Sequence, residues 1–121
     1  MTESRSKYNA RRTKIDGYTF DSAAEARRYS ELKLLERNGD ILRLAVHPKF
    51  EIQAAFVDNT NTRVRRIIYT GDFEYCEEPD ARMVVEDVKG VETAVFKIKS
   101  KLFRRLYPEY DLRVIPAKDV E

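Results

Sequence analysis

Two aspartates and a lysine are the residues of this chain best suited to chemistry. Side chains two apart on a strand point to the same face, so Asp87 and Lys89 of Asp87-Val88-Lys89 project together. A turn around Pro79-Asp80 would place Asp72 opposite Asp87, with their Cβ atoms roughly 4.5–5.5 Å apart. Because two carboxylates at that spacing repel each other, we expect a cation between them. A divalent metal ion is the natural candidate.

The alternative is an ion pair between Asp87 and Lys89 that carries no chemistry. Val84, Val85 and Val88 mark the same strand as buried. A buried acidic cluster without a metal ion would be energetically expensive, because its charges lose their hydration. The sequence therefore favours metal binding.

Positive charge is concentrated towards the two ends of the chain and negative charge in its middle, although the net charge is only +2. The candidate nucleic-acid contacts are Lys7, Arg11, Arg12, Lys14, Lys97, Lys101, Arg104 and Arg105. The stretch from Asp72 to Asp87 is acidic, with seven Asp and Glu residues against Arg82 alone. Basic segments suit a phosphodiester backbone and central acids suit a metal ion, so the pattern favours a metal enzyme acting on nucleic acid. The alternative is ordinary solvated charge.

The composition predicts a globular cytoplasmic protein without a membrane partner. The length of 121 residues suits one compact domain, and 42% of the residues are hydrophobic. No run approaches the roughly 18 apolar residues of a membrane span, and no signal peptide is evident. The single Cys76 excludes an internal disulfide. The single His47 excludes a histidine-cluster metal site, and we assign it to the loop before Pro48 without a catalytic role.

The expected elements place these residues on a sheet between two helices. Residues 1–14 are expected to form a flexible basic arm and residues 15–121 a single domain, beginning with a turn or short β-extension at Ile15–Phe20. The pattern then predicts a helix, three strands, a helix and a strand. Their bounds are Ser22 to about Asn38, Phe50–Val57, Val64–Tyr75, Arg82–Lys89, about Thr93 to Tyr107, and Asp111–Ile115.

Glu25, in the first helix, has two interpretations. Ser22 followed three residues later by Glu25 is a capping-box pattern, in which Glu25 only caps the helix. Glu25 also begins a helical stripe with Tyr29 and Leu32 that is expected to face the sheet, which would bring its carboxylate towards the aspartates. The local pattern supports both interpretations equally.

The second helix carries two stripes. An apolar stripe, expected to face the core, comprises Val95, Ile98, Leu102 and Leu106. A basic row lies on a different face and comprises Lys97, Lys101 and Arg104 or Arg105. Such a row is usually solvated, but this one begins eight residues after Lys89, so we favour phosphate contact.

The ordered motifs resemble the PD-(D/E)XK nuclease superfamily. They are Lys7-Tyr8-Asn9-Ala10, Phe20-Asp21-Ser22-x-x-Glu25-Ala26-x-Arg28-Tyr29, Pro48-x-Phe50, Tyr69-x-x-Asp72-Phe73 and Glu86-Asp87-Val88-Lys89-Gly90. From Lys7 to about Val114 the chain is similar to a phage and prophage family of small nucleases, whose nearest functional analogues are Holliday-junction resolvases. The (D/E)-x-K triplet is common by chance, whereas the ordered set is much more specific. Gly71 stands where the superfamily pattern has proline.

The resemblance implies an α/β (α+β) protein with a restriction-endonuclease-like core, a mixed sheet flanked by helices in the order αβββαβ. It implies that Asp72 and Asp87 ligate Mg²⁺, for which Mn²⁺ can substitute, with the Val88 carbonyl and Glu25 as further ligands. Lys89 would orient the attacking water and offset transition-state charge. The reaction would be hydrolysis of a DNA phosphodiester bond, leaving a 5′-phosphate and a 3′-hydroxyl.

Glu86 should lie on the opposite face of its strand, where we favour a role as structural partner for basic residues of a helix; the alternative is that it reaches the site through a bulge. Tyr69 and Lys97 are secondary candidates for phosphate contact. Three functions remain distinct. The first is a structure-selective endonuclease that cuts branched DNA as a homodimer, in a bacterial cell carrying a phage or prophage. The second is a nicking or end-processing phage nuclease without junction selectivity, and the third is a non-catalytic DNA-binding module with structural acids.

Overall fold

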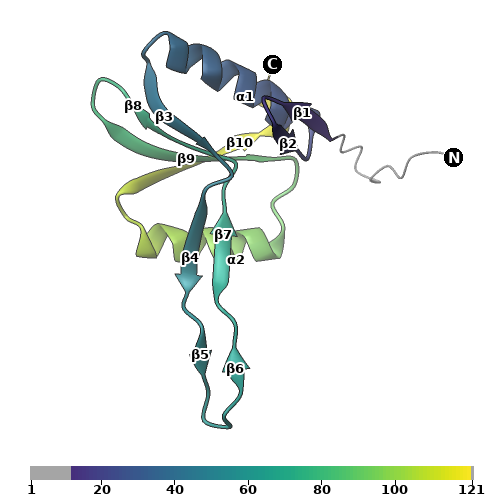
Figure 1. Ribbon diagram of the computed structural model, residues 1–121, viewed down its shortest axis with the longest axis vertical. Helices are drawn as coiled ribbons and strands as arrows, with labels where there is room; N and C mark the ends of the chain where they lie inside the picture. Colours follow the sequence, from purple (N-terminus) through teal and green to yellow (C-terminus); the bar gives the residue numbers. More distant parts are fainter. Residues whose placement is uncertain (1–11, 121) are drawn as a thin grey trace, which may run out of the picture.

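A computed structural model describes residues 12–120 of the chain. It is a mixed α and β structure, as expected, built on a four-stranded sheet in the order β10-β9-β8-β3 (Figure 1). These strands are β3 (Ile41–Val46), β8 (Phe73–Glu77), β9 (Arg82–Lys89) and β10 (Tyr110–Pro116). β10 runs parallel to β9, and the other two pairs are antiparallel. Helix α1 (Ala23–Arg37) covers one face of the sheet and helix α2 (Ala94–Leu106) the other.

Capping residues explain why both helices lie within one residue of their expected bounds. The Ser22 hydroxyl accepts a hydrogen bond from the Glu25 N–H at 3.1 Å and begins α1. α1 ends at Arg37 with Asn38 as its C-cap, and Gly39 follows with a φ of 84° that glycine adopts without strain. The Thr93 side chain accepts from the Phe96 N–H at 3.1 Å and begins α2. No helix of residues 12–120 is long and apolar enough to cross a membrane.

The strands match the expected bounds less well. β9 has the expected bounds and β10 is one residue longer at each end. The expected strand Phe50–Val57 is two strands, β4 (Lys49–Gln53) and β5 (Phe56–Val57). The prediction of a single strand over Val64–Tyr75 was also wrong. This region contains three strands, β6 (Arg63–Val64), β7 (Ile67–Thr70) and the first part of β8.

β3 was missed altogether, and the start of the domain was placed too late. In β3 the pairing register shifts between Leu42 and Ala45, and Arg43 has a φ of 60°. This bulge interrupts the alternation by which a strand is recognised. The expected β-extension is a hairpin of β1 (Thr13–Ile15) and β2 (Tyr18–Phe20), so the basic arm cannot extend to residue 14.

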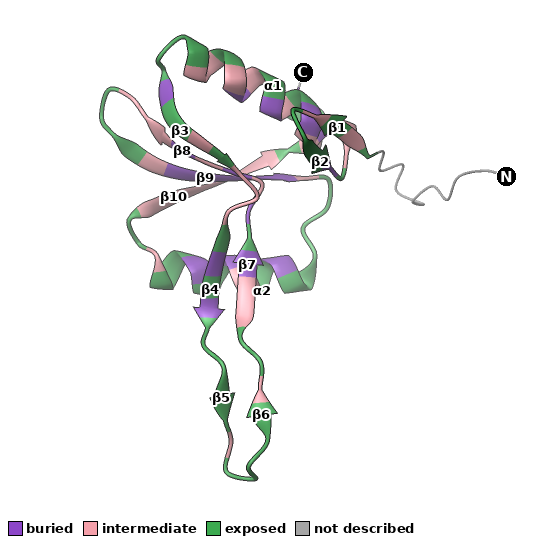
Figure 2. Ribbon diagram, viewed as in Figure 1, coloured by how far each residue is buried: buried purple, intermediate pink, exposed green. Residues whose placement is uncertain are grey.

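A long hairpin projects from the sheet (Figure 1). β4 pairs with β7 and β5 with β6, and we call residues 49–70 the β-arm. At its base the His47 N–H donates to the Asp72 carbonyl at 2.9 Å, and the Gly71 N–H donates to the Pro48 carbonyl at 2.9 Å. The outer part, β5 and β6, is almost entirely exposed (Figure 2). The β-arm is therefore rooted beside Asp72.

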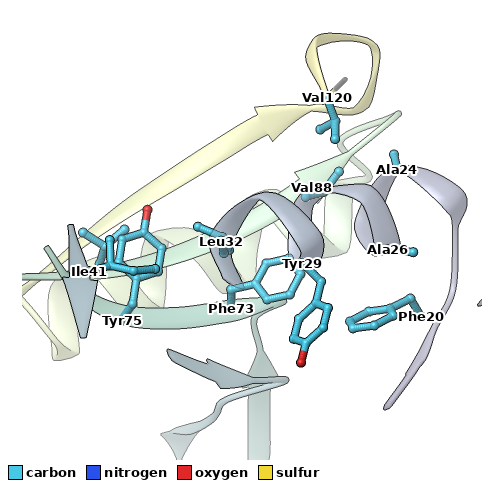
Figure 3. Packing of buried hydrophobic residues seen from close by; sticks show 11 residues of the cluster. Phe20, Ala24, Ala26, Tyr29, Leu32, Ile41, Phe73, Tyr75, Val88 and Val120 are labelled. Carbon is cyan, nitrogen blue, oxygen red and sulfur yellow. The ribbon is translucent and has the colours of Figure 1, made fainter. Parts of the chain in front are cut away.

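The sheet separates two hydrophobic cores. Under α1, Tyr29 and Leu32 pack with Phe73 and Val84 of the sheet, as the stripe on this helix predicts (Figure 3). On the other face, a second cluster joins α2, the β-arm and Val85. Its buried members are Phe50, Ile52, Tyr69, Val85, Phe96 and Phe103. Successive residues of β9, such as Val84 and Val85, thus serve opposite cores.

The apolar stripe of α2 does not face the core, contrary to expectation. Its members are exposed by 62% (Val95), 61% (Ile98), 39% (Leu102) and 51% (Leu106). The buried face instead carries Phe96, Ser100 and Phe103. At about 100° per residue, this face lies roughly a third of a turn away from the stripe. The rings of Phe50 and Tyr69 on the β-arm pack against Phe103 and select the aromatic face.

Substitutions on α2 should distinguish its buried aromatic face from its exposed apolar stripe by their effect on the free energy of unfolding. Phe103→Ala is expected to lower the free energy of unfolding by about 3–5 kcal/mol, because it empties a fully buried site. Ile98→Ser is expected to change it by less than about 0.5 kcal/mol, because that side chain is already in water. Urea unfolding measures both values. A larger loss for Ile98→Ser than for Phe103→Ala would contradict this orientation of the helix.

Candidate metal centre

Asp72 lies opposite Asp87 at the end of the β8–β9 pair that is away from the connecting turn. Phe73 pairs with Glu86, and this register places Asp72 opposite Asp87, as the turn at Pro79-Asp80 predicts. The Asp72 N–H donates to the Glu86 carbonyl at 2.9 Å, and Asp72 Oδ2 accepts from the Val88 N–H at 2.6 Å. The backbone of β9 therefore holds Asp72 in place, although it lies one residue before β8.

Asp87 and Lys89 lie on the same face of β9, as expected. Lys89 Nζ is 3.3 Å from Asp87 Oδ1 and 4.5 Å from the centre of the Phe96 ring. The Tyr69 hydroxyl donates to Asp87 Oδ2. Tyr69 is only 3% exposed, so its expected role as a phosphate contact was wrong. It orients the Asp87 carboxylate instead.

Two further side chains, those of Glu25 and His47, lie close to Asp72. Glu25, His47 and Asp72 each offer one ligand atom, and these atoms all lie within 4.8 Å of one another. Glu25 comes from the first turn of α1. Its backbone N–H donates to the Ser22 hydroxyl, whereas its carboxylate lies in the cluster, as the helical stripe predicts.

His47 was not expected at the site. It lies at the kink between β3 and β4, with a φ of 56°. His47 directly precedes Pro48, and this sequence indicates an irregular backbone. The direction of the imidazole, however, is set by the backbone conformation at His47 and cannot be read from the sequence. His47 therefore lies in the loop before Pro48, as expected, but its ring lies beside Glu25 and Asp72, which the sequence did not predict.

Two acids of the cluster, Glu25 and Asp72, have raised pKa values. Burial, with the charges of Asp87 and Glu25 adding to it, raises the pKa of Asp72 to about 8. Burial is the main cause that raises the pKa of Glu25 to about 7, and the negative charge of the nearby Asp21 is the second cause. A bound cation would reverse both effects, because it favours the ionised carboxylates.

These shifts predict how the stability of the metal-free protein depends on pH. In the unfolded chain both carboxyls ionise near pH 4, at about 3.9 for Asp and 4.3 for Glu. The folded protein keeps their protons up to about pH 7 and 8. It therefore binds more protons than the unfolded chain across this range, so these groups lower the free energy of unfolding as the pH rises.

Urea unfolding in EDTA between pH 5 and 8 tests this dependence. Asp72→Asn is expected to remove part of the decrease, and the exposed Asp119→Asn is expected to leave it unchanged. If the two variants have parallel pH profiles, the raised pKa of Asp72 is contradicted.

Glu86 lies on the opposite face of β9 and is fully buried, as expected. Its carboxylate accepts from Arg28 Nε at 2.7 Å and from Arg28 Nη2 at 2.6 Å, and also from the Tyr75 hydroxyl. Arg28 is on α1, so Glu86 ties this helix to the sheet. This structural pairing is the role that the strand pattern predicts.

The candidate nucleic-acid contacts occupy several surfaces. Lys97 lines a pocket of about 430 Å³ together with Lys89, Gly90 and Glu92. Further along α2, the row continues with the exposed Lys101, Arg104 and Arg105. Arg12 and Lys14 are exposed in or beside β1. Lys7 and Arg11 lie outside the described residues.

Close packing explains why glycine occupies position 71. A Cβ atom on Gly71 would lie 2.8 Å from Val85 Cγ1. Proline would also remove the N–H that donates to the Pro48 carbonyl. Glycine therefore allows the base of the β-arm to approach β9 next to Asp72.

The chain is similar to one protein family. The family model, described as a protein of unknown function (DUF1064), matches residues 5–119. No curated protein and no solved structure matches the chain. The match includes all the candidate site residues, and the activity has to be inferred from the site itself.

Proposed function

We propose that this chain, which belongs to the DUF1064 family of proteins of unknown function, is a metal-dependent endonuclease that hydrolyses DNA phosphodiester bonds. One observation carries the proposal: Asp72, Asp87 and Lys89 converge on one face of the β8–β9 pair, beside Glu25. The mixed sheet with a helix on each face also supports a restriction-endonuclease-like core.

The donor set fits a divalent ion. Carboxylate oxygens suit Mg²⁺ and Mn²⁺, and two of the acids keep raised pKa values that an ion would lower. Asp72, Asp87 and Glu25 would hold the ion, and the Val88 carbonyl remains a proposed ligand. When bound, the ion supplies Lewis acidity to the phosphate and lowers the pKa of a coordinated water.

The chain's own residues would do the remaining work. Tyr69 and Lys89 hold the two Asp87 oxygens, which keeps that carboxylate oriented. Lys89 Nζ has further N–H donors, so it can orient the attacking water and offset the charge that develops on the phosphate. The products would carry a 5′-phosphate and a 3′-hydroxyl.

Charge around the site supports DNA as the substrate. α2 carries Lys97, Lys101, Arg104 and Arg105 and no acidic residue. The β-arm adds the exposed Lys49, Arg63, Arg65 and Arg66. A two-stranded ribbon of this kind fits a DNA groove, and its root at Asp72 favours a substrate with several duplex arms around the site. We therefore favour branched DNA, cut by a homodimer that places one site on each of two strands.

Cleavage assays on a four-way junction and on its linear arms test the proposal. The purified protein with Mn²⁺ should cut the junction at least about tenfold faster, which corresponds to about 1.4 kcal/mol in the barrier. Equal rates would reject junction selectivity and leave a general nuclease. The nuclease proposal itself fails if no DNA is cut and Asp87→Ala does not change metal binding. Light scattering tests the homodimer.

Shortening the β-arm should weaken binding to the junction. Replacing residues 55–65 with Asn-Gly removes β5 and β6 and joins Ala54 to Arg66, which lie next to the paired Gln53 and Ile67. The loss of Arg63 and Arg65 is expected to raise the Kd by about tenfold and to reduce its salt dependence. Fluorescence anisotropy measures both. Thr62→Ala at the tip is the control, and an unchanged Kd for the shortened arm would contradict the role of the arm.

A further inference from the structure

The backbone at His47 is held in an uncommon conformation beside the acids. Its φ of 56° is left-handed, which few residues other than glycine adopt, and the next residue is Pro48. Hydrogen bonds fix both sides of this kink, from the His47 N–H to the Asp72 carbonyl and from the Gly71 N–H to the Pro48 carbonyl. The kink therefore holds His47 in a fixed position relative to Asp72.

The imidazole has an environment that suits a ligand. Its ring lies 5.8 Å from the buried Phe20 ring, which limits its orientations. Within residues 12–120, no group forms a hydrogen bond with its side chain. By contrast, the Asp87 oxygens already contact Tyr69 and Lys89.

Distances between the donors fit a single ion. Glu25, His47 and Asp72 supply atoms within 4.8 Å of one another, from α1 and from the two chain segments at the base of the β-arm. Two ligands about 2.2 Å from one ion lie at most about 4.4 Å apart. Side-chain movements of less than about 1 Å would bring the three donors onto one ion.

We propose that His47 is a nitrogen ligand of the metal ion and that it makes this centre prefer Mn²⁺ to Mg²⁺. Mg²⁺ takes oxygen ligands, whereas an imidazole nitrogen raises affinity for first-row transition-metal ions. The inference rests on the proposed metal-dependent function and adds the identity of the ion. His47 would add one nitrogen ligand to the oxygen ligands of Glu25, Asp72 and Asp87.

Metal binding without DNA tests this inference. Mn²⁺ and Mg²⁺ are titrated separately by calorimetry into the full chain and into His47→Asn. Asparagine tolerates the left-handed conformation, so the variant should keep the kink. We expect the Kd for Mn²⁺ to rise by about 10- to 100-fold and the Kd for Mg²⁺ by less than about threefold. Pulsed EPR should show nitrogen coupling to Mn²⁺ in the wild type, and this coupling should disappear in the variant.

The controls distinguish failure of this inference from failure of the proposed function. Asp72→Asn should weaken the binding of both Mn²⁺ and Mg²⁺. If it weakens the binding of neither ion, the metal centre and the nuclease proposal both fail. Suppose that Asp72→Asn weakens the binding of both ions. If His47→Asn then leaves the Mn²⁺ affinity unchanged, or lowers the affinities for both ions equally, only the role of His47 is overturned. Wild-type nitrogen coupling that persists in His47→Asn overturns it as well. Circular dichroism confirms that each variant is folded.

Discussion

Asp87→Asn is expected to lower the rate of metal-dependent DNA cleavage by about 10³-fold or more. The change removes one carboxylate charge from the centre, and a catalytic ion contributes several kcal/mol to the transition state, at about 1.4 kcal/mol for each factor of ten. Single-turnover cleavage of a labelled junction in Mn²⁺ measures the effect. Asp119→Asn, exposed on the short helix Ala117–Asp119, should cleave at the wild-type rate.

Lys89→Met separates metal binding from transition-state stabilisation in the same assay. Because Lys89 is not expected to be a ligand, this variant should bind Mn²⁺ with at least wild-type affinity yet cleave about 10²- to 10³-fold more slowly. Asp87→Asn should instead lose both metal affinity and rate. Full cleavage by either variant would contradict the role given to that residue.

Arg28→Met is expected to lower the free energy of unfolding by about 3–5 kcal/mol. It leaves the fully buried Glu86 without the guanidinium that forms two hydrogen bonds with it. The same contact raises the pKa of Arg28 above its ordinary value, since the Glu86 carboxylate favours the charged guanidinium. Urea unfolding at pH 7 measures the loss.

A second arginine offers a matched control for this measurement. Arg113 also forms two hydrogen bonds with one carboxylate, that of Glu77, but about a third of each side chain is exposed. Arg113→Met should therefore cost about 1 kcal/mol or less. The double variant Arg28→Met/Glu86→Leu should be more stable than Arg28→Met alone, because no buried charge remains unpaired. Equal losses for Arg28→Met and Arg113→Met would contradict the importance of burial.

Local patterns in the sequence were sufficient for much of the acidic site. The turn at Pro79-Asp80 sets the register of its hairpin, so Asp72 opposite Asp87 follows from counting residues. The period of two along β9 places Asp87 with Lys89 and sends Glu86 to the other face. Helix bounds were predictable because their caps are short-range contacts. Each of these features depends on neighbours in the chain or on one tight turn.

Features that depend on distant partners were not predictable in this way. α2 has two faces rich in apolar residues, and the choice between them was made by Phe50 and Tyr69 of the β-arm. β3 escaped detection because its bulge at Arg43 removes the alternation.

The sequence by itself determined where the two acids and the lysine lie: Asp72 opposite Asp87 across the hairpin, and Lys89 on the same face of β9 as Asp87. Only the tertiary structure decided that His47 joins Glu25 and Asp72, because that contact requires the two segments at the base of the β-arm to meet the first turn of a helix. A local pattern specifies which way a side chain points from its own strand or helix. The packing of the whole sheet determines what that side chain meets.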